Sequence, residues 1–186
     1  MKITSYRNTG GVVTQRLLTL ENALNAMRAE TKSKPVSALR HNLQFIPPGA
    51  QSDYTGKLPI FIFGGAYKRT GSEQQLTCYN GLITLEINKL TGINEAKKLR
   101  NLASTFPQTL VCFVGASGKS VKIIIPFTLP DGTLPESTEQ IIFFHTQAYR
   151  DAVKWYQPQL RREIDLKKPV VERGCRMSYD PELYYN

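Results

Sequence analysis

The hydrophobic and polar positions of this chain follow two periods, one typical of strands and one typical of helices. A repeat of two residues indicates a β-strand, and a repeat near 3.6 residues indicates an amphipathic helix. By this criterion, residues 2–16 begin with a weak edge strand. The stronger patterns predict strands at 58–63, 74–79, 82–88, 109–114 and 121–127, and helices at 19–31, 94–104 and 137–156.

Several residues mark where these elements begin and turn. Thr19 is suited to be the N-cap of the first helix, and Ser137 with Gln140 three residues later forms a capping box for the longest one. Asn80-Gly81 is the strongest short hairpin signal in the chain. We therefore expect the strands on either side of it to pair with each other.

The helical stripes also predict which side chains are buried. In the helix at 94–104, Ala96, Leu99 and Leu102 are expected to face the core, whereas Arg100 is expected to face water. His145 adjoins the apolar stripe of the longest helix. A packed histidine is favoured there over a catalytic one.

These elements predict one α+β domain over residues 1–186, with a mainly antiparallel sheet and helices packed on one of its faces. Residues 1–56 would be a helix with a loop-rich lead-in, because 32–56 is rich in Lys, Pro, Ser and Gly, with a short ordered piece around 39–45. Residues 57–186 would form the core. Because the sequence stops on aromatic residues at 184–186, we expect the chain to be the N-terminal part of a longer protein.

Charge and cysteine usage narrow the classes of partner. The chain has 24 Lys+Arg against 15 Asp+Glu, which gives a formal charge of +9. This charge favours a polyanion such as nucleic acid as the binding partner, but it also fits a basic protein without such a partner. No apolar run is long enough to cross a membrane, and the N-terminus has no signal-peptide core. Cys78, Cys112 and Cys175 lack zinc-ligand spacing, which indicates reduced thiols in a cytoplasmic protein.

Gly118-Lys119-Ser120 resembles the end of a nucleotide-binding P-loop, but its context excludes that motif. Phe113 stands where the first glycine is required, and a β-branched run follows instead of a helix. Two interpretations stay open. The turn presents backbone N–H groups and Lys119 to a phosphate, or it is a tight turn with exposed charges.

Polar residues on two predicted strands form the second candidate. Glu86 and Asn88 share one face of their strand, and Lys122 lies near the start of another. If the strands are neighbours, a carboxylate and an amide face an ammonium. The alternative is a set of polar groups on the exposed face of a hairpin.

Three segments together resemble a known family. They are 80–88, the turn at 116–123, and a closing stretch with Ile164-Asp165, Arg173, Cys175 and 178–181. In order and spacing they are similar to the primase-like N-terminal domain that precedes virulence-associated-protein-E (VirE)-type helicase domains in bacterial mobile elements. That domain belongs to the archaeo-eukaryotic primase, or primase-polymerase, fold group. The resemblance covers most of the chain.

This resemblance implies an RRM-like palm and two-metal phosphoryl transfer, in which clustered carboxylates hold Mg²⁺ or Mn²⁺. Glu86 takes the first acidic position, Asn88 the second and Asp165 the third, so these three would be the catalytic and metal-binding residues. The resemblance also implies a set of residues that hold phosphates: Ser117, Gly118, Lys119, Lys122 and Arg173.

Three functions follow as expectations. The first is a primase-polymerase-like domain that engages nucleotides or single-stranded DNA in mobile-element replication, with a working or degenerate metal site. The second is a non-catalytic nucleic-acid-binding module with the same basic face. The third is a protein-interaction domain that docks onto a helicase domain.

Overall fold

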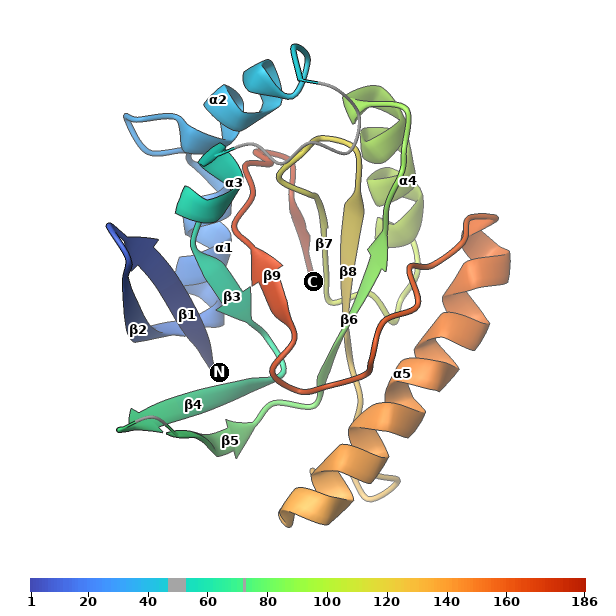
Figure 1. Ribbon diagram of the computed structural model, residues 1–186. Coiled ribbons are helices and arrows are strands. Elements are labelled where there is room, and N and C mark those ends of the chain that lie inside the picture. The colour runs from blue at the N-terminus through green and yellow to red at the C-terminus, as the bar shows by residue number, and fades with distance from the viewer. Residues whose placement is uncertain (47–52, 72) are drawn as a thin grey trace.

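Antiparallel pairing organises the strands into open sheets (Figure 1). The computed structural model describes residues 1–46, 53–71 and 73–186. Within these residues there are two four-stranded sheets, β2-β1-β3-β9 and β10-β7-β8-β6, and a two-stranded sheet, β4-β5. The expected α+β class with antiparallel pairing is therefore confirmed.

The elements follow one another along the chain as strands interrupted by helices. The strands are β1 (Lys2–Thr9), β2 (Val12–Thr19), β3 (Ile60–Ile62), β4 (Gly65–Thr70), β5 (Glu73–Tyr79), β6 (Leu82–Ile87), β7 (Val111–Val114), β8 (Val121–Pro126), β9 (Gly174–Arg176) and β10 (Tyr184–Tyr185). The helices are α1 (Leu20–Arg28), α2 (Pro35–Asn42), α3 (Asp53–Lys57), α4 (Ile93–Ser104) and α5 (Thr138–Leu160).

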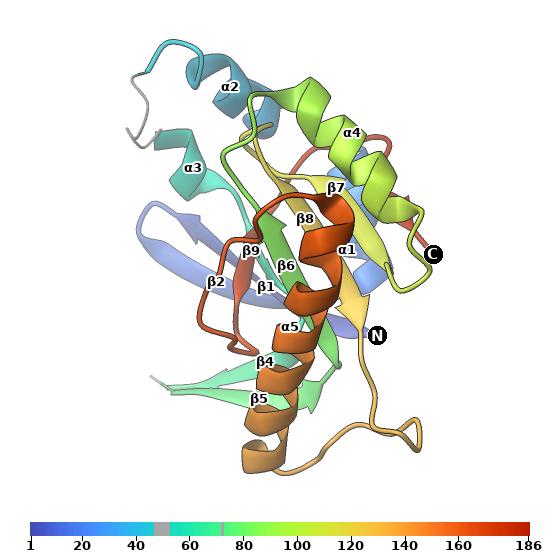
Figure 2. The ribbon, with the colours of Figure 1, turned by 90° about the vertical axis from the view of Figure 1, so that its right-hand side faces the viewer.

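The sheet β10-β7-β8-β6 is the centre of the molecule because both of its faces are covered. Helices α4 and α5 lie on one face (Figure 2), where Ile83, Leu85 and Ile87 of β6 are buried against them. The alternate residues of β6 point the other way, toward the layer formed by β3, α1 and α2, where Leu82 joins a second apolar cluster. Glu86 is on this second face, between the layers.

The predicted helix starts are confirmed by their caps. Thr19 Oγ1 accepts a hydrogen bond from the Asn22 N–H at 3.1 Å, and Ser137 Oγ accepts one from the Gln140 N–H at 3.3 Å. Helix α5 continues past the expected end to Leu160. None of the helices in the described part of the chain could span a bilayer.

The predicted hairpin at Asn80-Gly81 is wrong. Strand β5 pairs with β4, and β6 pairs with β8, so the dipeptide links two different sheets. Asn80 Nδ2 donates to the carbonyls of Lys2 at 2.8 Å and Phe63 at 3.0 Å, which fixes this link against neighbouring strands. Gly81 has φ +65°, and a Cβ there would lie 2.5 Å from the Phe127 carbonyl oxygen. Glycine is therefore required at this position because another backbone segment passes close to it, and not because of a hairpin turn.

The lead-in is more ordered than predicted. The expected edge strand is a complete hairpin, β1–β2, with Gly10 and Gly11 in the left-handed region at its turn. The expected loop over 32–56 contains α2 and the start of α3. Its residues 47–52 lie outside the described part of the chain.

Arg100 is buried, although the helical pattern placed it in water. Its Nη1 lies 2.5 Å from Asp180 Oδ1, and its Nη2 lies 2.9 Å from Glu182 Oε2. The second oxygen of Asp180 accepts the Val114 N–H at 2.8 Å. A guanidinium can be buried on the core side of α4 because a distant carboxylate compensates it, and that partner cannot be read from the local pattern. Leu102, expected in the core, is exposed instead.

Replacing Arg100 by Met is expected to lower the free energy of unfolding by about 3–5 kcal/mol, because it leaves the buried Asp180 carboxylate without its counter-ion. Urea denaturation measures this. Lys97→Met on the same helix is the control, since the Lys97–Glu182 pair is exposed and 3.4 Å apart and should contribute less than about 1 kcal/mol. Equal losses in the two variants would contradict the prediction.

Candidate functional site

Glu86 and Lys122 form the floor of the site. They lie directly opposite each other in the antiparallel pair β6–β8, on the face that points between the two layers. The Lys122 ammonium pairs with Glu86 Oε1. Their side chains are only 18% and 12% exposed, respectively, so this is a largely buried ion pair and not a pair on a solvated hairpin.

Asp165 reaches the same place from the segment after α5. Its backbone N–H donates to the Glu86 carbonyl at 2.8 Å, which lays this segment along the edge of β6. The Tyr149 hydroxyl on α5 donates to the Asp165 carbonyl at 3.3 Å and holds the segment from the other side. Asn88 Nδ2 donates to Asp165 Oδ2 at 2.7 Å. The structure therefore brings together Glu86, Asn88, Lys122 and Asp165.

Lys167 joins this group and carries no motif in the sequence. Its Nζ lies 3.1 Å from Glu86 Oε2 and 3.0 Å from Asp165 Oδ2, so one ammonium bridges both carboxylates. The only sequence signal for Lys167 was its spacing of two residues from Asp165. In an extended segment this spacing places both side chains on the same side. We call Glu86, Asn88, Lys122, Asp165 and Lys167 the charge cluster.

The charge cluster is electrically balanced. Burial lowers the pKa of the Lys122 ammonium to about 8, and the Lys167 charge acts in the same direction. The hydrogen bond from Lys167, helped by that from Asn88, holds the pKa of the Asp165 carboxyl below its usual range. The cluster therefore sets two lysines against two acids.

A pocket of about 340 Å³ opens above the charge cluster. Besides the cluster residues Glu86, Asn88, Lys122 and Lys167, it is lined by Leu39, Leu43, Thr55, Ala116, Ser117, Ser120, Gly174, Cys175 and Arg176. A second pocket of about 340 Å³ shares Leu43 and Ser117 with it and extends to Arg40, Lys119 and the N-terminus of α4. The two pockets adjoin each other along the turn between β7 and β8, and we call them together the groove.

Two amides of the turn are engaged within the turn itself. The Gly118 N–H donates to the Gly115 carbonyl at 3.0 Å, and the Lys119 N–H donates to Ser117 Oγ at 3.2 Å. Arg40 of α2 supports the turn from behind, donating to the Ala116 carbonyl at 3.2 Å. A phosphate at this turn would therefore meet side chains, of which Lys119 is exposed.

The residues implied to hold Mg²⁺ or Mn²⁺ do not fit a divalent cation as they are arranged. The Lys167 ammonium occupies the position between Glu86 and Asp165 that the metal would need. Asn88 turns its amide donor, and not its carbonyl, toward Asp165. In the described residues, no group of three His, Cys, Asp or Glu side chains could hold a metal ion.

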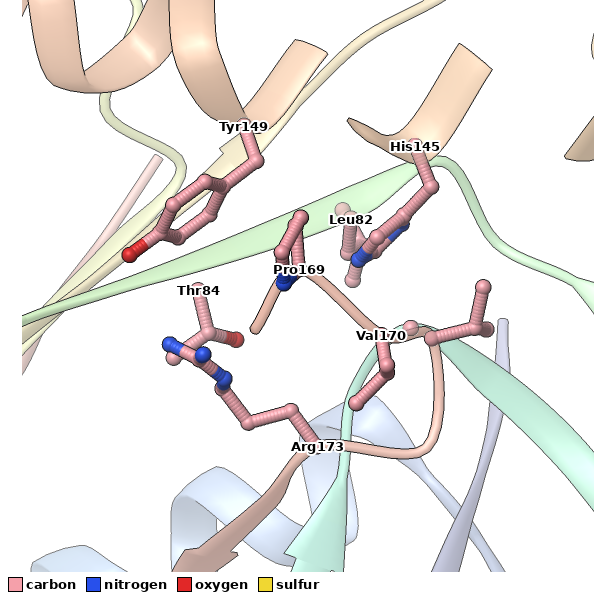
Figure 3. A pocket seen from close by; sticks show the side chains of 9 residues that line it. Leu82, Thr84, His145, Tyr149, Pro169, Val170 and Arg173 are labelled. Atoms are coloured by element: carbon pink, nitrogen blue, oxygen red, sulfur yellow. The ribbon is translucent and has the colours of Figure 1, made fainter. Parts of the chain in front are cut away.

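Arg173 lies apart from the groove, contrary to its implied role with the phosphates. Its guanidinium stacks over the Tyr149 ring, 5.2 Å from the centroid, and Nη2 donates to the Lys168 carbonyl at 2.6 Å. It lines a separate cavity of about 10 Å³ with Thr84 and His145 (Figure 3). That volume is on the order of a single water molecule.

His145 is a packed histidine, as the stripe on α5 favoured. It is buried, and its Nδ1 lies 3.1 Å from the Tyr79 hydroxyl. Burial lowers its pKa to about 4, and the nearby positive charge of Arg173 acts in the same direction. The imidazole is therefore neutral at physiological pH.

Comparison with protein-family models matches residues 53–185 to the BT4734-like, N-terminal domain, which covers more than half of the chain. The resemblance to the primase-like domain of virulence-associated-protein-E helicases is therefore wrong, because the matching family is a different one. Searches of curated proteins and of solved structures found no match.

The buried histidine predicts a specific acid sensitivity. The folded-state pKa of His145, about 4, is below its ordinary value of 6.5, so between these values only the unfolded chain binds the proton. Stability should fall as pH falls through this window, by on the order of 3 kcal/mol from this one group. His145→Gln should remove this part of the pH dependence when urea unfolding is compared at about pH 7 and about pH 4.5.

The control for this prediction is His41→Gln, which replaces the chain's other histidine at an exposed position. It should keep the wild-type pH dependence. If His145→Gln lost as much stability between about pH 7 and about pH 4.5 as wild type does, His145 would not be the source of the acid sensitivity.

Proposed function

Because the chain belongs to the BT4734-like, N-terminal domain family, whose name specifies no activity, we propose its function from the geometry of its site. The domain binds single-stranded nucleic acid by its phosphates, along the groove between the β7–β8 turn, α2 and the charge cluster. We assign it no phosphoryl-transfer chemistry.

The observation that carries this proposal is the excess of positive charge along the groove. Among the described residues that line the two pockets, five are basic and only Glu86 is acidic. The basic residues are Arg40, Lys119, Lys122, Lys167 and Arg176. Glu86 is already paired with two of these lysines, and Arg40 donates to carbonyls of the β7–β8 turn. The exposed Lys119 and Arg176 therefore remain available to a polyanion.

The shape of the groove favours a strand over an isolated phosphate. Lys119 lies in one pocket and Arg176 in the other, so successive phosphates of one chain can be held in separate places. Phe45 follows the groove residue Gln44, is 73% exposed and stands edge-on to His41 with ring centroids 5.0 Å apart. An exposed aromatic beside a basic groove is the arrangement on which unpaired bases stack.

The internal pairing of the charge cluster supports binding without catalysis. Glu86 and Asp165 are both saturated by ammonium groups of the same chain. They give the floor of the groove a fixed shape and keep Lys122 and Lys167 in position.

The test is fluorescence anisotropy with a labelled single-stranded oligonucleotide of about 12 nucleotides, titrated at several salt concentrations. Wild type should bind more weakly as salt rises. Lys119→Gln should weaken binding and reduce the slope of log K against log salt by about 0.7, as expected for one lost phosphate contact on a single strand.

Lys154→Gln is the matched control, because Lys154 is an exposed lysine on α5, outside the residues that line the groove. It should bind like wild type. Absence of binding at low salt, or equal losses in the two variants, would refute the proposal.

A further inference from the structure

One lysine of the charge cluster stands where a bound cation would stand. Lys167 Nζ is 3.1 Å from the Glu86 carboxylate, which lines the groove, and 3.0 Å from the Asp165 carboxylate. In an oxygen-lined site, a divalent metal ion usually binds between two carboxylates in this way. Here the bridging charge is supplied by the chain itself.

The charges of the cluster also sum to zero without a metal. Lys122 neutralises one oxygen of Glu86, and Lys167 neutralises the other together with Asp165. A divalent cation entering this place would meet two ammonium groups at close range. Its attraction to the two carboxylates would be offset by that repulsion.

Lys167 is held at this position by its backbone as well as by its charge. Its N–H lies 3.3 Å from the Tyr149 hydroxyl, which also donates to the Asp165 carbonyl. Tyr149 thus fixes both ends of the short stretch that carries the acid and the lysine. The backbone from which the Lys167 side chain extends is therefore held by contacts with α5 and β6.

We propose that Lys167 is a built-in counter-cation that takes the place of a divalent metal, so that the groove binds phosphate without one. The statement about phosphate rests on the proposed function. The statement about the cation does not, because it concerns only the carboxylates and the lysine between them.

The cation statement is tested by Mn²⁺ binding, followed by the electron paramagnetic resonance signal of free Mn²⁺. Wild type should show no specific site. Lys167→Met removes the ammonium and should create a site that binds Mn²⁺ at least about tenfold more tightly than wild type. Adding Glu86→Gln to Lys167→Met should abolish the new site.

Lys97→Met is a closely matched control, because Lys97 is also an ion-paired lysine, with its side chain 45% exposed against 46% for Lys167. It should gain no Mn²⁺ site. Circular dichroism and thermal melting establish that each variant is folded, and Lys167→Gln replaces Lys167→Met if the latter is not. The proposal is overturned if wild type binds Mn²⁺ as tightly as the Lys167 variant, or if neither Lys167 variant gains a site.

The phosphate statement is tested with the same oligonucleotide in EDTA and in Mg²⁺ at equal ionic strength. Equal affinity in the two buffers is expected, and a several-fold gain in Mg²⁺ would overturn the statement. Absence of binding in both buffers would refute the proposed function, while the Mn²⁺ measurement would still decide the role of Lys167.

Discussion

The buried ion pair between Arg100 and Asp180 is the contact on which the arrangement of this fold depends. Asp180 receives the Arg100 guanidinium from α4 and the Val114 N–H from β7, and its own N–H donates to the Met27 carbonyl of α1. Elements from the beginning, middle and end of the chain therefore meet at one carboxylate. Arg40 of α2 donates to the carbonyl of Tyr179, the residue before Asp180, and to the Ala116 carbonyl in the β7–β8 turn. The segment held by Asp180 is thus also tied to one wall of the groove.

The site follows from strand alternation between two packed layers. Because residues of β6 alternate between faces, Ile83, Leu85 and Ile87 serve the core under α4 and α5, while Glu86 points into the space between the layers. A carboxylate in that space needs a counter-charge, and the antiparallel register places Lys122 directly opposite. The charge cluster thus combines a requirement of burial with the geometry of the groove.

Local signals in the sequence were sufficient for most elements, because caps and strand alternation depend on nearby residues. They placed Glu86 opposite Lys122 only on the condition that the two strands are neighbours, and the β6–β8 pairing meets that condition. They failed where a distant partner decides the outcome. Arg100 is buried only because Asp180 compensates it, 80 residues away. Asn80-Gly81 became a link between sheets because strands elsewhere in the chain were better partners for β5 and β6. Lys167 could not be identified, since its role depends on a segment folding back along β6.

That folded-back segment has a consequence for solubility. Strand β6 is the outer strand of its sheet, and such strands offer unpaired backbone groups to other chains. The stretch between α5 and β9 runs beside β6 (Figures 1 and 2), and its Asp165 N–H takes the Glu86 carbonyl. The residues that shape the groove therefore also close this border against strand-to-strand aggregation.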